Sequence, residues 1–355
     1  MDTPKIIINE EILKLVAAID EFKGAWRAFQ NIAPDTLNRL RKVATVESIA
    51  SSTRIEGAEL SDSEVEKLLS GVGLTSFHSR DEEEVAGYAD AVSLVFKSFN
   101  EINLTENHIR QMHQILLKYS SKDTRHRGEY KKLSNNVEAF DANGKSMGVI
   151  FQTATPFETP FKMRELVDWF EKAEKERRQH MLILIAVFIV HFLAVHPFQD
   201  GNGRLSRIIT TLLLMRAGYL YVPFSSLEHI IEENKEAYYL SLRRAQSTLV
   251  TDNSQLAEWI LFFLRSLKRQ TEVLSSKLDT EKSLLSIPSL SQSILLASRE
   301  RGNITIRDIV IITGANRNTI KAHVQNLVRE KLLFREGKGK RRLVSLLMRN
   351  SPRNG

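Results

Sequence analysis

Cysteine is absent from the 355-residue chain. Its absence excludes disulfide bonds and thiolate metal sites, and it fits a protein of a reducing compartment. The N-terminal segment, MDTPKIIINEEILKL, has neither the basic start nor the small-residue cleavage site of a secretory signal peptide. We therefore expect a cytoplasmic protein.

The sequence also lacks a hydrophobic run long enough to cross a membrane. Its most apolar stretch, MLILIAVFIVHFLAV at 181–195, is shorter than the roughly 20 residues that a spanning helix needs. The polar segment HPFQDGNGR follows it directly. This pattern predicts a buried central helix and no membrane partner.

Repeats and low-complexity tracts are absent as well, and strand signals are few. Helical periodicity dominates and predicts a mainly α protein. Asp35 is the expected N-cap of the first of these helices, Gly57 its stop, and Ser61 or Asp62 the start of the next. One hairpin is expected between helices, because VEAF and MGVIFQ flank the turn signal Asp-Ala-Asn-Gly at 141–144. The expected helices cover 36–56, 63–70, 80–99, 105–119, 160–177, 180–195, 203–217, 232–247 and 253–274.

The composition is that of a soluble protein, with 42% hydrophobic and 26% charged residues. The net charge of +7 is unevenly distributed. Residues 296–355 contain 14 Arg or Lys against 4 Asp or Glu, a local net charge of +10, so the remainder of the chain is slightly acidic. The basic character therefore belongs to the C-terminal end.

The pattern of segments predicts two domains preceded by an N-terminal helical region. We assign that region to 1–100, a catalytic core to 101–274, a Ser-, Lys- and Leu-rich linker or weak helix to 275–289, and a last domain to 290–355. The last domain reads helix, tight turn, helix, then a Gly-Lys hairpin between two short strands. That is the order of a winged helix-turn-helix.

The segment HPFQDGNGRLSR, at 196–207, concentrates reactive side chains. The turn Gly201–Gly203 precedes a helix, and a glycine-rich turn at a helix N-terminus presents backbone N–H groups to an anion. Arg204 and Arg207 share one face of the first turn, where cations oppose the helix dipole unless a strong anion is bound. Asp200 is placed to carry Mg²⁺ beside a phosphate, and His196 is a base near neutral pH. The combination predicts phosphoryl or nucleotidyl transfer; the alternative is a capped turn with solvated arginines.

This segment resembles the signature of the Fic family, His-x-Phe-x-Asp/Glu-Gly-Asn-Gly-Arg-x-x-Arg, without departure. Similarity extends over roughly residues 35–265 and includes the apolar helix before the motif and LLLMRAGY after it. The resemblance implies a helical Fic core with an inserted β-hairpin flap. It also implies an enzyme that moves AMP from ATP to a Ser, Thr or Tyr hydroxyl of a protein and releases pyrophosphate.

The resemblance also assigns roles within the motif. His196 would deprotonate the hydroxyl, Asp200 would hold Mg²⁺ against the phosphates, and Phe198 would be a buried anchor of the loop. The amides of the turn and the Asn202 side chain would form the anion hole. Downstream, KEAYYLSLRRAQ resembles the segment that lines the adenosine, with Gln246 where relatives often have Asn. The residues implied in nucleotide binding are Gly201, Asn202, Gly203, Arg204, Arg207, Tyr238, Tyr239 and Gln246.

The hairpin expected between about 137 and 153 would be the flap that holds the target by strand addition. An ordinary surface hairpin is the alternative. The edge that would pair with the target comprises Met147, Gly148, Val149, Ile150, Phe151 and Gln152.

A second motif, SSTRIEG, matches the family's inhibitory pattern Ser/Thr-x-x-x-Glu-Gly/Asn from Ser52 to Gly57. In relatives with this pattern, the glutamate pairs with the second arginine of the signature, here Glu56 with Arg207. The carboxylate would take the place of the γ-phosphate and damp the reaction. The alternative, a solvated acid at a helix C-terminus, is unfavourable because helix C-termini prefer cations.

Other functions stay open on the sequence alone. The core would be the nucleotide sensor of a transcription regulator, or an enzyme that removes AMP from a modified protein with Glu56 positioning the attacking water. A third alternative is a transferase that uses a nucleotide donor other than ATP. The C-terminal domain would bind DNA or dock a protein, and the chain would act as a monomer or an oligomer. The residues expected to contact DNA are Arg317, Asn318, Lys321, Lys338, Lys340 and Arg341.

Overall fold

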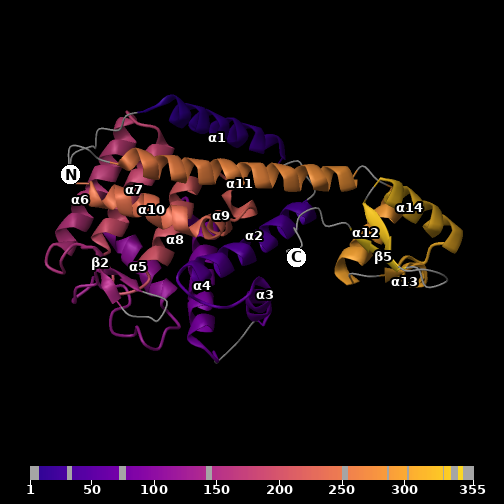
Figure 1. Ribbon diagram of the computed structural model, residues 1–355, viewed down its shortest axis with the longest axis horizontal. Helices are drawn as coiled ribbons and strands as arrows, with labels where there is room; N and C mark the ends of the chain where they lie inside the picture. Colours follow the sequence, from indigo (N-terminus) through magenta and orange to yellow (C-terminus); the bar gives the residue numbers. More distant parts are fainter. Residues whose placement is uncertain are drawn as a thin grey trace. The chain divides into compact units, whose positions relative to one another are not determined.

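The computed structural model describes residues 8–29, 34–71, 77–140, 146–249, 255–285, 288–301, 304–330, 332–336 and 343–346. The chain divides into two compact units, Met1–Leu274 and Ser275–Gly355. Helices dominate the first unit, as the periodicity predicts (Figure 1). Its elements are α1 (Glu10–Phe29), α2 (Pro34–Ile55), α3 (Asp62–Ser70), α4 (Arg80–Ser98), α5 (Glu106–Leu116), β1 (Val137–Phe140), β2 (Ser146–Phe151), α6 (Thr159–Glu176), α7 (Met181–Val195), α8 (Asn202–Arg216), the 3₁₀ turn η1 (Val222–Phe224), α9 (Leu227–Glu233), α10 (Lys235–Ser247) and the beginning of α11 (Leu256–Leu285).

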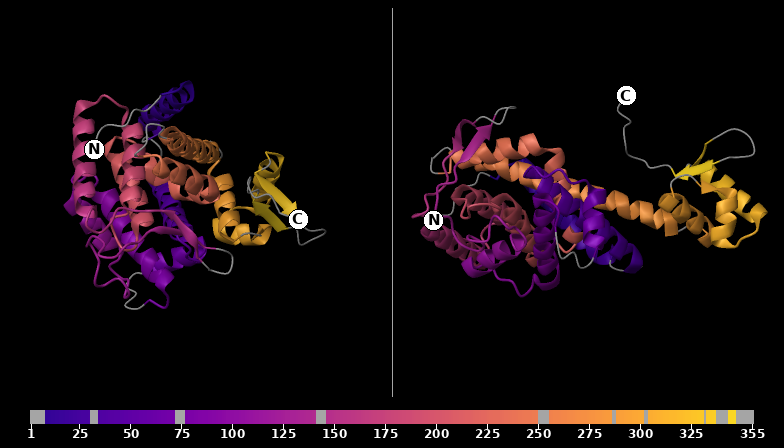
Figure 2. Two further views of the ribbon diagram at one scale, coloured as in Figure 1. Left: turned by 60° about the vertical axis from the view of Figure 1, so that its left-hand side comes forward. Right: turned by 90° about the horizontal axis from the view of Figure 1, so that it is seen from below.

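Two helices that contact each other, α7 and α8, contribute most of their residues to the core of the first unit. α7 is apolar on every side, and twelve of its residues are buried. A helix that is apolar all round is stable in water only when other elements cover it. α6, α8, α10 and α11 do so, and the helices of the first unit pack closely together (Figure 2). Trp259 of α11 donates a hydrogen bond of 2.7 Å from its Nε1 to the Ala186 carbonyl. In the described residues, no helix has the length and hydrophobicity needed to cross a membrane.

Caps define several helix ends. Ser61 caps α3 in a reciprocal capping box with Glu64, which confirms the predicted start. Asp35 is not the N-cap of α2, because the helix already begins at Pro34, a residue suited to a first turn. α2 ends at Ile55 in a Schellman pattern, in which Gly57 has φ +105° and Ala58 N–H bonds the Thr53 carbonyl. This ending fixes the direction in which Glu56 leaves the helix.

Two predicted segments differ from the structure in extent. The single helix expected over 232–247 is two helices, α9 and α10, which meet at Asn234. Asn234 leaves helical geometry with φ −119° and ψ 30°. The sequence left two alternatives for 275–289, a linker or a weak helix. In the structure α11 is helical as far as Leu285.

The strands of the first unit pair antiparallel. β1 and β2 form a two-stranded sheet in which Val137 faces Phe151 and Phe140 faces Ser146. Two register irregularities interrupt the pairing. The turn between them, 141–145, lies outside the described residues.

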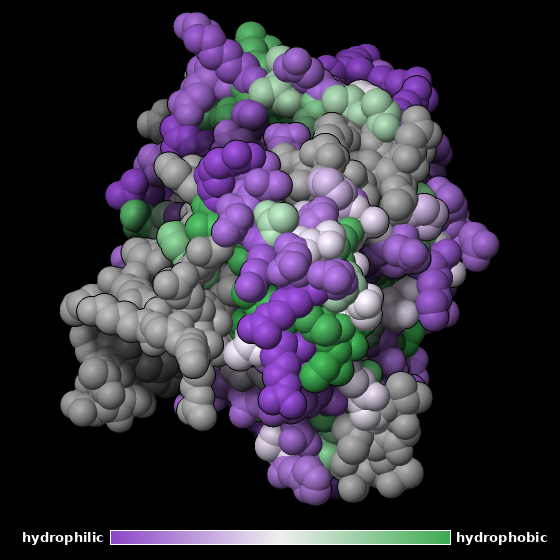
Figure 3. Space-filling view, turned by 90° about the vertical axis from the view of Figure 1, so that its right-hand side faces the viewer, coloured by the Kyte–Doolittle hydropathy of each residue, from purple (hydrophilic) through white to green (hydrophobic). Residues whose placement is uncertain are grey.

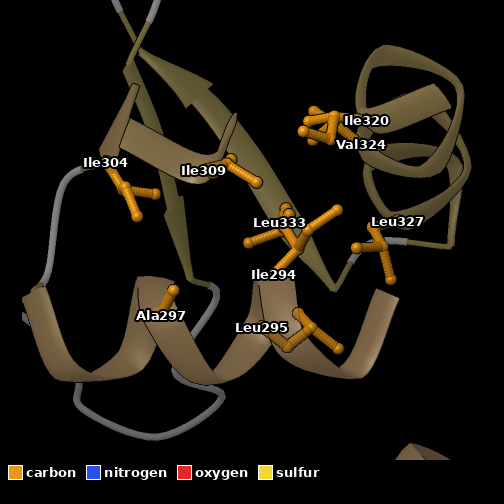
Figure 4. Close-up of a cluster of buried hydrophobic side chains, with 9 residues drawn as sticks. All are labelled: Ile294, Leu295, Ala297, Ile304, Ile309, Ile320, Val324, Leu327 and Leu333. Atoms are coloured by element: carbon orange, nitrogen blue, oxygen red, sulfur yellow. The ribbon is translucent and has the colours of Figure 1, made fainter. Parts of the chain in front are cut away.

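The second unit contains three helices and a small antiparallel sheet. The helices are α12 (Ser289–Arg301), α13 (Ile306–Thr313) and α14 (Arg317–Arg329), and the strands are β3 (Ile304–Thr305), β4 (Leu333–Glu336) and β5 (Leu343–Leu346). The sheet order is β3-β5-β4. Nine buried apolar side chains from all three helices and from β3 and β4 meet in one core (Figure 4). The unit thus has a hydrophobic core of its own.

The face of the molecule shown in Figure 3 is largely polar. Among the coloured residues of Figure 3, hydrophilic side chains predominate and hydrophobic ones form only small patches. This distribution is the one expected when the apolar residues of amphipathic helices face a core.

Candidate active site

His196 stands at the junction of the two central helices. It is the C-cap of α7 and has a left-handed backbone conformation, with φ 52° and ψ 61°. Such a conformation is rare for a residue other than glycine, and it persists where surrounding contacts over-determine it. The chain then turns through Pro197–Gly201 and enters α8 at Asn202. Five residues of loop therefore place an imidazole beside a helix N-terminus.

The Asn202 side chain closes this loop. Its Oδ1 accepts a hydrogen bond of 2.9 Å from Phe198 N–H, and its Nδ2 donates one of 2.7 Å to the Phe198 carbonyl. The sequence prediction placed this amide in the anion hole. In the structure both of its polar atoms are instead used to hold the loop. Phe198 is fully buried, which agrees with its expected role as an anchor.

His113 of α5 also holds this loop in place, and the sequence prediction missed it. Its ring stacks on Phe198 with centroids 3.8 Å apart. Nδ1 accepts from Gly128 N–H at 2.9 Å, so the proton lies on Nε2, which is 3.0 Å from the Asp200 carbonyl and donates to it. Burial lowers the pKa of His113 to about 4, which keeps the ring neutral. No local sequence pattern links His113 to a loop 87 residues away.

Lys131 and Asn135 hold the other side of the loop and were also missed. The Lys131 ammonium donates to Asn135 Oδ1 at 2.7 Å, to Thr153 Oγ1 at 2.8 Å and to the Val195 carbonyl at 3.1 Å. Asn135 Nδ2 donates to the Phe198 carbonyl at 2.6 Å. Burial lowers the pKa of Lys131 to about 8. A buried lysine with three oxygen partners thus ties the start of the hairpin to the end of α7.

His196 is available as a base. Burial lowers its pKa to about 4, and the nearby Lys131 charge acts in the same direction. At neutral pH the imidazole is therefore uncharged and can accept a proton.

The N-terminus of α8 is suited to bind an anion. Gly201 is its N-cap with φ 78°, and a glycine has no side chain with which to cap the N–H groups of the first turn. At Gly203 a Cβ atom would collide with Glu56 Oε1. The Glu56 carboxylate therefore lies directly over the backbone at the start of α8, where the helix dipole and free amides favour a negative charge.

Glu56 pairs with Arg207, as the motif predicts. Arg207 Nη2 lies 2.7 Å from Glu56 Oε1, and the same guanidinium donates to Ser52 Oγ at 2.8 Å and to the Ser52 carbonyl at 2.9 Å. The Arg207 side chain is 4% exposed, whereas that of Glu56 is 32% exposed. The arginine is thus fixed by α2, and the acid that neutralises it remains accessible to solvent.

Asp200 and Arg204 interact within the motif. Asp200 Oδ1 accepts from Gly201 N–H at 2.5 Å and lies 3.2 Å from Arg204 Nη2. The Arg204 side chain is 2% exposed and also forms an ion pair of 2.8 Å with Glu84 of α4.

Both arginines retain unused donors. Arg204 Nε and Arg207 Nη1 are buried and have no hydrogen-bond partner in the described residues, and the geometry of the Arg204–Glu84 ion pair leaves Nη1 of Arg204 without a hydrogen bond as well. Buried unsatisfied donors are costly and uncommon in folded proteins. An acceptor-rich anion such as a polyphosphate would satisfy them.

The three residues expected to contact the nucleoside differ in what surrounds them. Tyr238 is 4% exposed; burial raises the pKa of its hydroxyl, and the nearby Arg207 charge acts in the opposite direction. The Tyr239 hydroxyl donates to the Ile55 carbonyl at 3.4 Å. Gln246 is buried near the end of α10, and no contact described here brings it to the motif. Tyr238 and Tyr239 thus lie beside the Glu56–Arg207 pair.

The expected flap is the β1–β2 pair. β2 contains Met147–Phe151 and lies near α10, and Gln152 follows it. Thr153, at the base of the hairpin, is the residue that Lys131 contacts. The hairpin is thereby connected to the loop that carries His196.

A divalent cation would have one protein carboxylate at this site. No group of three or more metal-ligating side chains occurs among the described residues. Mg²⁺ is commonly held by one or two carboxylates together with substrate phosphates and water. The Asp200 carboxylate, 32% exposed, fits that mode of binding.

In the second unit, the first turns of α14 carry the polar residues predicted to contact DNA. Arg317, Asn318 and Lys321 are all exposed. Lys338, Lys340 and Arg341 lie outside the described residues.

Comparisons with known proteins agree with this arrangement. Residues 103–214 match the model of the Fic/DOC family. The chain is 27% identical over 232 residues to the protein adenylyltransferase Fic of Drosophila willistoni, covering 65% of this chain and 42% of that protein. It is 31% identical over 99 residues to a probable protein adenylyltransferase of Aquifex aeolicus, covering 28% of each chain. The chain thus spans less than half the length of either relative.

Solved structures have the same fold. A Fic family protein from Desulfovibrio desulfuricans superposes with a TM-score of 0.62 at 22% identity, covering 99% of this chain and 100% of that one. Fic-1 from C. elegans gives a TM-score of 0.56 at 20% identity, covering 77% of this chain and 72% of that one. Together with the family match, these similarities show a Fic/DOC domain over residues 103–214 and the fold of Fic family proteins.

Proposed function

We propose that this protein is an adenylyltransferase that moves AMP from ATP to a hydroxyl group of a protein. The observation that carries the proposal is a pair of buried arginines with unpaired donors at an uncapped helix N-terminus, next to a neutral histidine. A triphosphate supplies the acceptors that these donors lack. The names of the curated relatives support the same activity.

In the proposed reaction, the oxygen of the target hydroxyl attacks the α-phosphorus of ATP. His196 takes the hydroxyl proton, an O–P bond forms to AMP, and the bond to the β-phosphate breaks with release of pyrophosphate. Arg204, Arg207 and the N–H groups at the start of α8 stabilise the charge on the phosphates. Positioning and electrostatic stabilisation account for most of the rate in reactions of this kind.

Mg²⁺ would bind Asp200 and the phosphates, and it would supply positive charge at the leaving group. Asn135, His113 and the Asn202 side chain keep the loop from 196 to 201 in place through the contacts given above. They act through the loop and do not touch the reacting atoms.

Glu56 acts as an intramolecular inhibitor in this proposal. Its carboxylate lies over Gly203 and neutralises Arg207, so it competes with the terminal phosphate for the same two features. The hairpin would bind an extended segment of the target along β2 and align its hydroxyl with His196. Backbone pairing tolerates many sequences, so the flap does not specify the target.

The first test is the intact mass of Glu56→Gly protein after incubation with Mg²⁺ and ATP, beside wild type and the double variant Glu56→Gly/His196→Ala. The proposal expects a gain of one AMP on the Glu56→Gly protein, little on wild type and none on the double variant. A foreign protein target is assayed in parallel, because modification of the enzyme itself is not obligatory. AMP transfer by the double variant at the rate of the single one would refute the role of His196.

The exposed cations of α14 favour a second function for the C-terminal unit, which we propose to be DNA binding through a winged helix-turn-helix. Arg317, Asn318 and Lys321 are exposed together at the start of the helix that would enter the major groove. Binding through phosphate contacts weakens steeply as salt rises. Fluorescence anisotropy with a labelled duplex at 50 and 200 mM salt tests this, and Arg317→Ala/Lys321→Ala should bind more weakly. A lack of salt-sensitive binding by wild type would refute the proposal.

A further inference from the structure

A closed ring of four charged side chains lies beside the candidate active site. Arg80 Nε contacts Glu84 Oε1 at 2.8 Å, Glu84 Oε2 contacts Arg204 Nη1 at 2.8 Å, and Arg204 Nη2 contacts Asp200 Oδ1 at 3.2 Å. Arg80 Nη2 closes the ring on Asp200 Oδ2 at 3.0 Å. Charges alternate around it, so every ion has two neighbours of opposite sign.

Two members of this ring come from α4, which precedes the region matched by the family model. Arg80 is the first residue of α4, and a cation at a helix N-terminus opposes the helix dipole. Its position is compensated by two carboxylates, of which one belongs to α4 and the other to the motif. The guanidinium is therefore held at Asp200 by specific contacts despite an unfavourable helix position.

The exposure of the four side chains divides the ring into a fixed and a movable half. Arg204 and Glu84 are 2% and 10% exposed, whereas Arg80 and Asp200 are 50% and 32% exposed. Arg80 can leave Asp200 by rotating into solvent without disturbing the core. Arg204 remains paired with Glu84 when this happens.

Both oxygens of Asp200 are engaged in this arrangement. Oδ1 accepts from Gly201 N–H and faces Arg204, and Oδ2 faces Arg80. A divalent cation on Oδ2 would lie within a few ångströms of the guanidinium, and like charges at that distance repel. The cation and Arg80 therefore compete for one carboxylate oxygen.

We propose that Arg80 is a placeholder cation: its guanidinium neutralises Asp200, the metal-binding carboxylate, until a divalent cation displaces it. The inference rests on the proposed function, because that function requires a cation at Asp200. Arg80 is thus a positioning residue that sets divalent-cation affinity. It acts in addition to Glu56, which pairs with Arg207 of the same motif.

The test measures Mn²⁺ affinity by isothermal titration calorimetry on Glu56→Gly protein, with and without α,β-methylene-ATP, which cannot transfer AMP. Arg80→Ala is compared with the parent and with Lys118→Ala, which removes an exposed ion pair of 3.0 Å to Asp90 of the same helix. An exposed ion pair has a modest strength, so we expect Arg80→Ala to tighten Mn²⁺ roughly two- to fivefold and Lys118→Ala to leave it unchanged. Arg80→Lys, which keeps the charge, should bind Mn²⁺ nearly as the parent does.

Unchanged or weaker Mn²⁺ binding by a folded Arg80→Ala protein would overturn the proposal. Weaker binding would mean that Arg80 assists the cation or its nucleotide. Thermal melting checks the fold, and Arg80→Gln serves as a second variant if the alanine protein is unstable. Binding of α,β-methylene-ATP in the presence of Mn²⁺ is measured separately: a lack of nucleotide binding contradicts the proposed function, whereas the nucleotide-free Mn²⁺ titration still tests the role of Arg80.

Discussion

Removal of the Glu56 carboxylate should release AMP transfer. Glu56 contributes one charged hydrogen bond of 2.7 Å to a fully buried guanidinium. A hydrogen bond to a charged group stabilises by about 1.5–3 kcal/mol, which corresponds to a population change of about 10- to 150-fold. We expect Glu56→Gly to raise the rate of AMP transfer within that range.

The same free energy predicts residual AMP transfer by the wild-type protein. A switch from 1:99 to 99:1 requires about 5.5 kcal/mol, more than one charged hydrogen bond supplies. Because Ser52 keeps two contacts to Arg207, the arginine stays in place after Glu56 is removed. The gain should therefore appear in the rate, without loss of the fold.

The assay is the initial rate of AMP incorporation, read by intact mass at saturating ATP. Glu56→Gln should have an intermediate rate, because it keeps the hydrogen-bond acceptor and loses the charge. Glu59→Gly, three residues further along and exposed, is the matched control and should behave as wild type. If Glu56→Gly binds ATP but transfers AMP no faster than wild type, the inhibitory role of Glu56 is refuted.

Three further predictions concern the helix terminus and the buried histidines. Gly203→Ala should lower ATP affinity about tenfold or more even in Glu56→Gly protein, because its Cβ would occupy the approach of an anion to α8; calorimetry would contradict this if the affinities were equal. The His196 ring should titrate near pH 4 in the nucleotide-free protein, so AMP transfer should not fall between pH 8 and about 5.5 through His196; an NMR midpoint near 6.5 would refute this. Burial also lowers the pKa of His191 to about 4, so the unfolded state binds more protons between pH 6.5 and 4 and stability falls as pH falls through that window. His191 should account for up to about 2 kcal/mol of the loss between pH 7 and 5, and His191→Phe should show a correspondingly flatter pH dependence in urea unfolding.

Much of the helical framework follows from local chemistry in the sequence. The apolar stretch 181–195 is a buried helix because no other arrangement in water covers a segment that is apolar all round. Ser61 and Glu64 define the start of α3 through a contact between residues three apart. The division at Asn234 was not predicted, since the periodicity of α9 and α10 continues across it and only the backbone angles reveal the break.

The motif residues were identifiable because their chemistry is concentrated in twelve consecutive positions. The sequence also paired Glu56 with Arg207, but through resemblance to relatives and not through spacing. The supporting residues had no such signal. His113, Lys131 and Asn135 are ordinary helix and loop residues in the sequence, and their function comes from contacts across tens of residues.

The sequence by itself determined the helical class and the central apolar helix, and it pointed to the residues that we propose bind a polyphosphate and accept a proton. Those properties depend on side-chain type and on spacing of a few residues, which folding does not change. Only the tertiary structure decided that Asn202 holds the loop, that Glu56 lies over Gly203, and that Arg80 and Glu84 complete a ring with the motif. These contacts join helices far apart in the chain, and their energies depend on distances and burial that arise only when the helices pack.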